Sequence, residues 1–232
     1  MKTRFLPFLL LMLTASLLFT VSSCKKDASD NDTIVSKTVD KFDYRIVHEW
    51  NDLFLEVERY AEGYRPCPTA NALGYLELAS YEACLDGMPG YASLAHLYQG
   101  LNIPATDGGK EYYWPAVVNA SQHYLMSRLF VEVASEKFEK IKALNDKNEK
   151  IFLTETSQET FFRSKNHGEA VAAAVWEWMK ADAATFDGYR NPFKENVWRD
   201  RINEPGAWVP TVPGPGEGMF PYWGKGRTLA IK

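Results

Sequence analysis

The spacing of apolar residues is the feature that most restricts what this chain can fold into. Between residues 42 and 185 of the 232-residue sequence, apolar side chains recur every three or four positions, the period of one face of an α-helix. In the first such stretch, residues 42 to 61, they are Ile46, Trp50, Leu53, Val57 and Tyr60. No stretch of this region alternates apolar and polar residues as a half-buried strand does. The pattern therefore predicts an all-α protein.

Breaks rich in Gly and Pro divide the rest of this region into further helices. We expect a central helix at residues 69 to 85, a short helical piece at 92 to 98, and a third long helix at 114 to 133 with Pro115 in its first turn. Residues 135 to 147 keep the same period, and one interpretation is that they extend the third helix. A last helix, ending near residue 181, is expected to begin at a capping box formed by Thr156 and Glu159.

Residues 191 to 232 have a different composition. They hold six of the twelve prolines and three of the seven tryptophans, which predicts an extended, non-helical segment. Because Trp198, Trp208 and Trp223 are costly to leave in water, we expect this segment to pack on the helices. The predicted fold class is thus an all-α helical bundle, residues 41 to 190, with an extended Pro/Gly/Trp-rich C-terminal segment.

The first residues are typical of an export signal. Lys2 and Arg4 precede an apolar run through residue 21, which is shorter than the roughly 20 residues that a spanning helix needs. The run ends in Val-Ser-Ser-Cys at residues 21 to 24, which resembles the lipobox of bacterial lipoproteins. That resemblance implies a signal peptide at residues 1 to 23, cleavage before Cys24 and acylation of Cys24. A retained transmembrane anchor is the alternative.

Residues 24 to 40 follow as a predicted tether, since they begin with a polar stretch without apolar periodicity. The expected partner of the anchor is a membrane. Lys25, where an inner-membrane retention signal has Asp, favours the bacterial outer membrane, with the periplasmic and surface faces both open. Cys67 and Cys84 are interpreted as separate thiols, because a helix between them holds them about 20 Å apart; a disulfide is the alternative.

Charge and motifs exclude several classes of function. A net charge of −4 argues against a nucleic-acid partner. The four histidines lack metal-ligand spacing, so no metal site is predicted, although His48 with Glu49 and His123 could meet in space. The glycine-rich residues 214 to 218 lack the Gly-Lys-Ser/Thr of a phosphate loop and are interpreted as a turn-rich linker.

The candidates for anion binding are Lys225 and Arg227, which alternate with glycines, together with His167. For His167 and the following Gly168, close helix packing is the favoured interpretation. No catalytic residue is predicted, because no nucleophile stands in a recognisable motif beside a base.

Several segments resemble bacterial vanadium-dependent haloperoxidase-like proteins, which belong to the type-2 phosphatidic acid phosphatase superfamily. The similar segments are residues 73 to 85, 114 to 121, 166 to 178 with Asp182, 207 to 213 and 220 to 227, with Thr228 where the family usually has Pro. The resemblance implies an all-helical fold. In a full-length relative it also implies a cationic pocket for vanadate or phosphate with two reactive histidines.

The family's catalytic motifs are missing from this sequence. Seven positions before Arg65-Pro66 stands Glu58 instead of Lys, Ser-Gly-His does not occur, and six residues after Arg128 stands Ala134 instead of His. In the family these motifs follow the Trp-Gly segment near which this chain stops. The leading hypothesis is therefore a truncated, lipid-anchored N-terminal helical module, without a cofactor of its own, inactive without a separate catalytic half.

Two alternatives remain open. One is an outer-membrane glycan-binding helical lipoprotein, suggested by the 14% of aromatic residues and the Trp-rich segment. The other is a broken reading frame without independent function. Because the motifs are missing, the sequence does not decide whether the chain is itself an enzyme.

Overall fold

A computed structural model describes residues 36–64, 66–186, 188–190, 204–209, 218–220 and 223–229. All of them belong to one compact unit, Val35–Lys232. The expectations for the signal peptide and for Cys24 lie outside these residues, as do most of the glycine-rich linker and Trp198. Among the described residues, no helix is both long and apolar enough to cross a bilayer.

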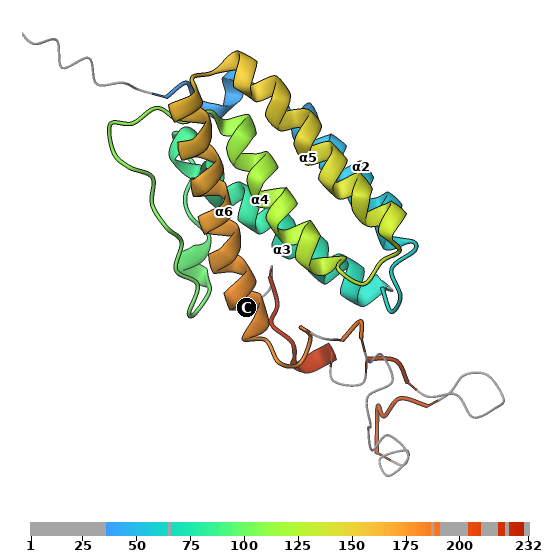
Figure 1. Ribbon diagram of the computed structural model, residues 1–232. Helices are drawn as coiled ribbons and strands as arrows, with labels where there is room; N and C mark the ends of the chain where they lie inside the picture. Colours follow the sequence, from blue (N-terminus) through green and yellow to red (C-terminus); the bar gives the residue numbers. More distant parts are fainter. Residues whose placement is uncertain are drawn as a thin grey trace, which may run out of the picture. The chain divides into compact units, whose positions relative to one another are not determined.

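The described residues form helices and no strand, so the all-α prediction is confirmed (Figure 1). The long helices are α2 (Arg45–Glu58), α3 (Pro66–Cys84), α4 (Trp114–Leu129), α5 (Ser135–Glu155) and α6 (Gln158–Lys180). Short 3-10 turns lie at Val39–Lys41, Leu85–Gly87, Ala95–Leu97 and Trp223–Lys225. The short helical piece expected at 92 to 98 is thus a single 3-10 turn.

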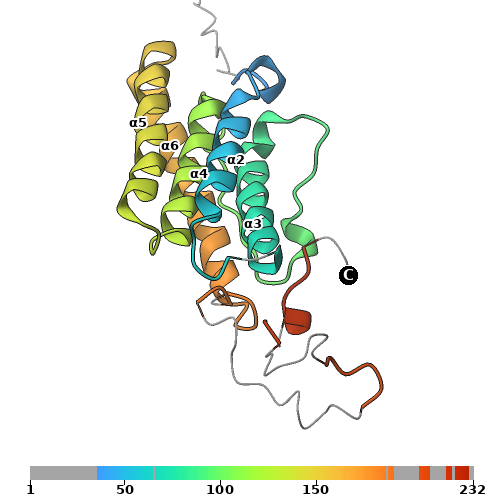
Figure 2. The same ribbon diagram turned by 90° about the vertical axis from the view of Figure 1, so that its right-hand side faces the viewer.

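Helix α4 is the centre of the bundle. It packs against α2, α3, α5 and α6, whereas the expected central helix, α3, packs mainly on α4 and α6 (Figures 1 and 2). Every residue from Trp114 to Gln122 is buried, so this helix has no solvent-facing side in its first half. Its closest neighbour is α6, where a Cβ on Gly168 would lie 2.2 Å from the Val117 carbonyl oxygen. The packing interpretation of Gly168 is confirmed.

The interpretation of residues 135 to 147 as an extension of the third helix is wrong. The chain leaves α4 at Phe130, whose backbone is no longer helical, and α5 returns antiparallel along α4 (Figure 1). The turn places the Phe130 ring in the core, 5.3 Å from the ring of Phe54 and 5.0 Å from that of Tyr64. Core packing of one aromatic ring therefore ends a helix whose sequence period continues.

The cap of α6 lies one residue later than expected. Ser157, not Thr156, is the N-cap, and its hydroxyl accepts from the Thr160 backbone N–H at 3.1 Å. Thr156 still belongs to the end of α5, because its N–H donates to the Phe152 carbonyl. Glu159 pairs with Arg163 at 2.9 Å.

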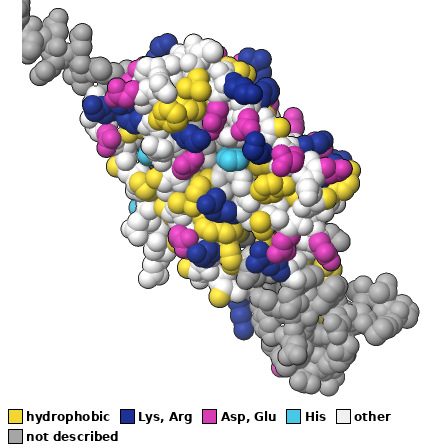
Figure 3. Space-filling view, in the orientation of Figure 1, with side chains coloured by type: hydrophobic (Ala, Val, Ile, Leu, Met, Phe, Trp, Pro, Cys, Tyr) yellow, Lys and Arg dark blue, Asp and Glu magenta, His cyan; other side chains and the backbone are white. Residues whose placement is uncertain are grey.

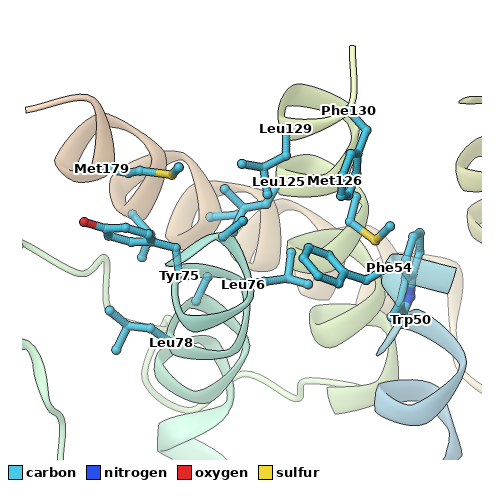
Figure 4. Packing of buried hydrophobic residues seen from close by; sticks show 14 of the residues in the cluster. Trp50, Phe54, Tyr75, Leu76, Leu78, Leu125, Met126, Leu129, Phe130 and Met179 are labelled. Atoms are coloured by element: carbon cyan, nitrogen blue, oxygen red, sulfur yellow. The ribbon is translucent and has the colours of Figure 1, made fainter. Parts of the chain in front are cut away.

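The main core is aliphatic and aromatic, and its residues come from all five long helices, with Phe130 after α4 (Figure 4). Its largest fully buried members include Trp50, Phe54, Tyr75, Leu76, Leu125, Met126 and Phe130. Burying a side chain of this size contributes about 2 kcal/mol, so this cluster supplies most of the driving force for folding.

One buried polar group is embedded beside this core. The side-chain oxygen of Asn119, on α4, accepts hydrogen bonds from Trp50 Nε1 at 3.0 Å and from Asn148 Nδ2 at 3.1 Å. The side-chain nitrogen of Asn119 donates to Asn145 Oδ1 at 2.8 Å. Asn145 also donates to Glu149, which forms a 2.7 Å ion pair with Lys165 on α6. A hydrogen-bonded chain thus connects α2, α4, α5 and α6.

Replacing Asn119 by Ala is expected to destabilise the protein by about 3 kcal/mol, because Trp50, Asn145 and Asn148 would each lose a buried partner. The measurement is the free energy of unfolding in urea. Asn166→Ala, on the exposed side of α6, is the matched control and should change stability by less than about 0.5 kcal/mol. A loss below about 1 kcal/mol for the Asn119 variant would contradict this role.

Candidate functional site

Arg227, one of the sequence candidates for anion binding, lies against the C-terminal end of α6. Its Nη1 donates to the Trp178 carbonyl at 2.8 Å and to the Tyr75 hydroxyl at 3.2 Å. Its guanidinium lies 3.7 Å from the centroid of the Trp178 ring, a cation–π contact. Its backbone N–H donates to the Asp182 carboxylate at 2.8 Å. Lys225, two residues earlier, is exposed.

The residues around Arg227 form a strap, residues 223 to 229, which crosses the middle of α3 and the C-terminal end of α6. A Cβ on Gly226 would lie 2.1 Å from the Thr185 methyl group, and a Cβ on Gly74 would lie 2.5 Å from the Leu229 side chain. The Tyr98 hydroxyl donates to the Leu229 carbonyl. The glycines at 74 and 226 thus permit contacts that fix the strap on the bundle.

His167 lies elsewhere. It is 8% exposed, its Nε2 is 3.1 Å from the Ala83 carbonyl, and its ring meets the Tyr112 ring edge-on at 5.5 Å. Eleven helical residues separate it from Trp178, a rise of about 16 Å along α6. The structure therefore does not bring His167 together with Arg227, and the anion-binding hypothesis for the three candidates stays a prediction.

His123 is half-buried in a setting of mixed charge. Its ring lies 6.3 Å from that of Trp50, and burial lowers its pKa, with Lys165 and Arg128 acting in the same direction and Glu149 against them. Both nearby cations have partners, since Lys165 pairs with Glu149 and Arg128 lies 3.4 Å over the Tyr124 ring. This arrangement gives no excess of positive charge.

His48 and Glu49 point to other partners. The His48 ring meets the ring of Tyr44 at 5.2 Å, and Glu49 pairs with Lys147 on α5 at 3.0 Å. Within the residues that the structure describes, no three His, Cys, Asp or Glu side chains come together as a metal site. On the face shown in Figure 3, basic and acidic side chains are interspersed.

The two remaining cysteines are free thiols at opposite ends of α3, as expected for separate cysteines. Cys67 is the second residue of the helix and Cys84 the last. Burial raises the pKa of Cys84 to about 12, so its thiol is unreactive at neutral pH.

Several polar side chains on the packed helices are buried, and the sequence pattern did not predict them. Glu82, 4% exposed, accepts from Ser93 Oγ at 2.8 Å and from the Leu94 N–H at 2.6 Å, and so fixes the loop after α3. Gln122, fully buried on α4, approaches Glu77 on α3. The signal was available, because a charged or amide residue inside an apolar run requires a partner.

The burial of His167 makes stability depend on pH. Burial lowers its pKa below 6.5, so the unfolded chain takes up this proton before the folded chain does. Stability present above pH 6.5 is therefore lost as the pH falls through 6.5 toward the folded pKa. We expect the free energy of unfolding to drop between about pH 7.5 and about pH 5.5, and to drop less in His167→Gln.

Urea denaturation at the two pH values measures this effect. His123 shifts in the same direction, so His167→Gln keeps part of the dependence and His123→Gln should likewise reduce it. Equal pH dependence in the wild type and in both variants would show that neither histidine is responsible.

Among known proteins, the chain is similar to a solved structure but to no family model and no curated sequence. Among solved structures, the chain is similar to one described as the first bacterial vanadium-dependent iodoperoxidase, with a TM-score of 0.60 and 25% sequence identity. The match covers 79% of this chain and 41% of that protein. The chain thus spans less than half of the iodoperoxidase, and the similarity supports a vanadium haloperoxidase-like fold.

Proposed function

We propose that this chain is the helical scaffold module of a membrane-anchored vanadium haloperoxidase-like or acid-phosphatase-like lipoprotein. The observation that carries the proposal is the structural similarity to the iodoperoxidase over 79% of the chain. The order of the resembling sequence segments supports the same assignment. In this role the bundle packs against a separate catalytic half and turns over no substrate by itself.

The described residues do not fit vanadate or phosphate. An oxyanion site needs several convergent cations and an imidazole free to react. Among the described side chains, the Arg227 guanidinium is held by Trp178 and Tyr75, Lys165 is neutralised by Glu149, and His167 is bonded to a backbone carbonyl. These groups support a structural role.

The anchor is part of the proposal. Acylation of Cys24 would hold the module at the outer membrane, because each buried CH₂ of an acyl chain contributes about 0.8 kcal/mol and a lipoprotein carries several chains. The polar tether after Cys24 then separates the folded unit from the lipid surface.

The purified full chain is expected to show no peroxide-dependent halide oxidation with vanadate and no hydrolysis of a chromogenic phosphomonoester. The reason is that the described residues assemble no cationic pocket. Both reactions are followed by absorbance, with the iodoperoxidase as the positive control for halide oxidation. Turnover that depends on added vanadate would contradict the proposal.

Anchoring is tested separately in cells. Radiolabelled palmitate should be incorporated into the wild-type chain and into Cys67→Ala, but not into Cys24→Ala. The Cys24 variant should also move from the membrane to the soluble fraction, because it lacks the acyl chains. Labelling of Cys24→Ala would show that the anchor is elsewhere.

A glycan-binding lipoprotein is the second candidate. Trp208 keeps 48% of its surface exposed, which an aromatic platform for a sugar requires. Trp223, in contrast, packs on the ring of Phe220 at 5.7 Å and against Gly188. A single exposed tryptophan is weaker support for glycan binding than the fold similarity is for the scaffold module.

A further inference from the structure

Several chain segments meet at the end of the bundle where the folded unit begins. The Ser36 hydroxyl accepts from the Tyr112 backbone N–H at 2.8 Å. One residue later, the Lys37 carbonyl accepts from Trp114 Nε1 at 2.7 Å. These bonds fix the start of the folded unit beside the first turn of α4. Helix α5 ends and α6 begins at the same end (Figures 1 and 2).

Aromatic rings join these segments on the inside. The Tyr113 ring, just before α4, lies 5.2 Å from the Phe42 ring and 5.4 Å from the Phe152 ring of α5. Phe152 also clusters with Phe161 of α6. Because these rings fill the interior of this end, the apolar side chains that follow or precede them in the sequence are left at the surface.

Four large apolar side chains remain exposed at this end. The exposed fraction is 42% for Ile151, 44% for Leu153, 46% for Phe162 and 72% for Tyr44. Such side chains are ordinary when they are scattered singly, but a group of them marks a surface for a partner or a membrane. Figure 3 shows hydrophobic side chains gathered near this end, with basic side chains beside them. We call these four residues the apolar patch.

An ion pair fixes how α5 lies against α2 near this end. Lys147 on α5 and Glu49 on α2 are 3.0 Å apart. The two helices run antiparallel, so one turn beyond this pair Ile151 reaches the start of α2. Tyr44 directly precedes the first residue of α2, which places Ile151 close to Tyr44.

A second ion pair fixes α5 against α6. Glu149 and Lys165 are 2.7 Å apart, and a short connection joins these two helices at this end. One turn beyond the pair, Leu153 on α5 therefore lies close to Phe162 on α6. The apolar patch thus extends from the start of α2 over the end of α5 to the start of α6.

The charges beside the patch are largely balanced, with additional lysines. Three acidic side chains are neutralised by ion pairs, namely Asp40–Lys41, Asp43–Arg45 and Glu159–Arg163. Glu155 accepts a hydrogen bond from the Tyr113 hydroxyl. Lys37 and Lys150 are exposed, and within the described residues neither forms an ion pair. Paired acids and free lysines suit contact with an anionic or neutral surface.

The proposed anchor lies a short distance before this end. Residues 24 to 35 precede Ser36, and an extended chain covers at most about 3.5 Å per residue. Whatever their conformation, these residues span no more than about 40 Å. An acylated Cys24 would therefore keep the end that carries the apolar patch near the lipid surface. The opposite end of α5 lies about 30 Å further along the helix.

We propose that the apolar patch is a membrane-contact surface, which inserts into the headgroup region of a phospholipid bilayer when Cys24 is acylated. The inference rests on the lipid anchor of the proposed function and adds the face that the module turns to the membrane. Aromatic and aliphatic side chains favour this region of a bilayer, and lysines beside them attract anionic lipids. The opposite end also exposes Tyr60 and Val131, but the folded unit does not begin there.

Fluorescence quenching tests the surface on the full chain, purified with its acyl chains and reconstituted in vesicles of phosphatidylethanolamine and phosphatidylglycerol. A thiol-reactive fluorophore is attached to Gln158→Cys or to Ser135→Cys, each in a Cys67→Ala background in which the remaining Cys84 is buried. Both positions are exposed first residues of a helix, of α6 at the patch end and of α5 at the opposite end. Spin-labelled phospholipid should quench most of the emission at position 158 and little at position 135.

The same assay tests the patch side chains. The triple variant Ile151→Ser, Leu153→Ser, Phe162→Ser should lose the quenching at position 158 but still float with the vesicles, because its anchor is intact. The control variant Leu55→Ser, Val131→Ser replaces similarly exposed apolar residues outside the patch and should retain the quenching. If the triple variant does not fold, Phe162→Ser alone should weaken the quenching.

Equal quenching at the two positions, in chains that float with the vesicles, would overturn the proposal. So would quenching at position 158 that survives the triple substitution, because the tether alone would then explain it. Emission that changes with the protein density in the bilayer and not with the quencher would show that the patch binds a second copy, which also overturns it. A chain that does not float would instead contradict the lipid anchor itself.

Discussion

The Asn119 carboxamide is the interaction on which the arrangement of the helices depends. Its oxygen accepts from Trp50 on α2 and Asn148 on α5, and its nitrogen donates to Asn145 on α5. Apolar contacts alone tolerate sliding and rotation of one helix against another, because they have no direction. A buried amide with three partners is satisfied in one register, and any displacement leaves several polar groups unpaired.

This constraint matters most for α4. Its first half is buried on all sides, so it lacks the polar face that orients a surface helix. Asn119 fixes its rotation toward α2 and α5, and Gln122 meets Ser80 on α3. On the α6 side, Gly168 lets the two backbones approach until its Cα lies near the Val117 carbonyl. Asn119, Gln122 and Gly168 thus fix the rotation of α4 about its axis, which apolar burial on all sides does not determine.

The sequence predicted those elements for which one local signal was sufficient. The apolar spacing of Ile46, Trp50, Leu53 and Val57 gave α2, and Pro115 marked the first turn of α4. It failed where two local solutions were nearly equal and a tertiary contact decided. Thr156 and Ser157 are both good caps, and the bond from Thr156 to the end of α5 selects Ser157. Similarly, the periodic pattern continues through Phe130, but its ring packs in the core and the helix ends there.

Arg227 shows that a similar fold and a glycine-rich basic segment are not sufficient for an oxyanion-binding site. Alternating glycines and basic residues suggested a loop that could bind an anion. In the structure the guanidinium is stacked on Trp178 and bonded to a carbonyl and a hydroxyl, while the backbone beside it is bonded to Asp182. These contacts also fix the strap on the bundle. The function of a fold depends on the side chains that it carries, and in this fold the Arg227 guanidinium stabilises the scaffold.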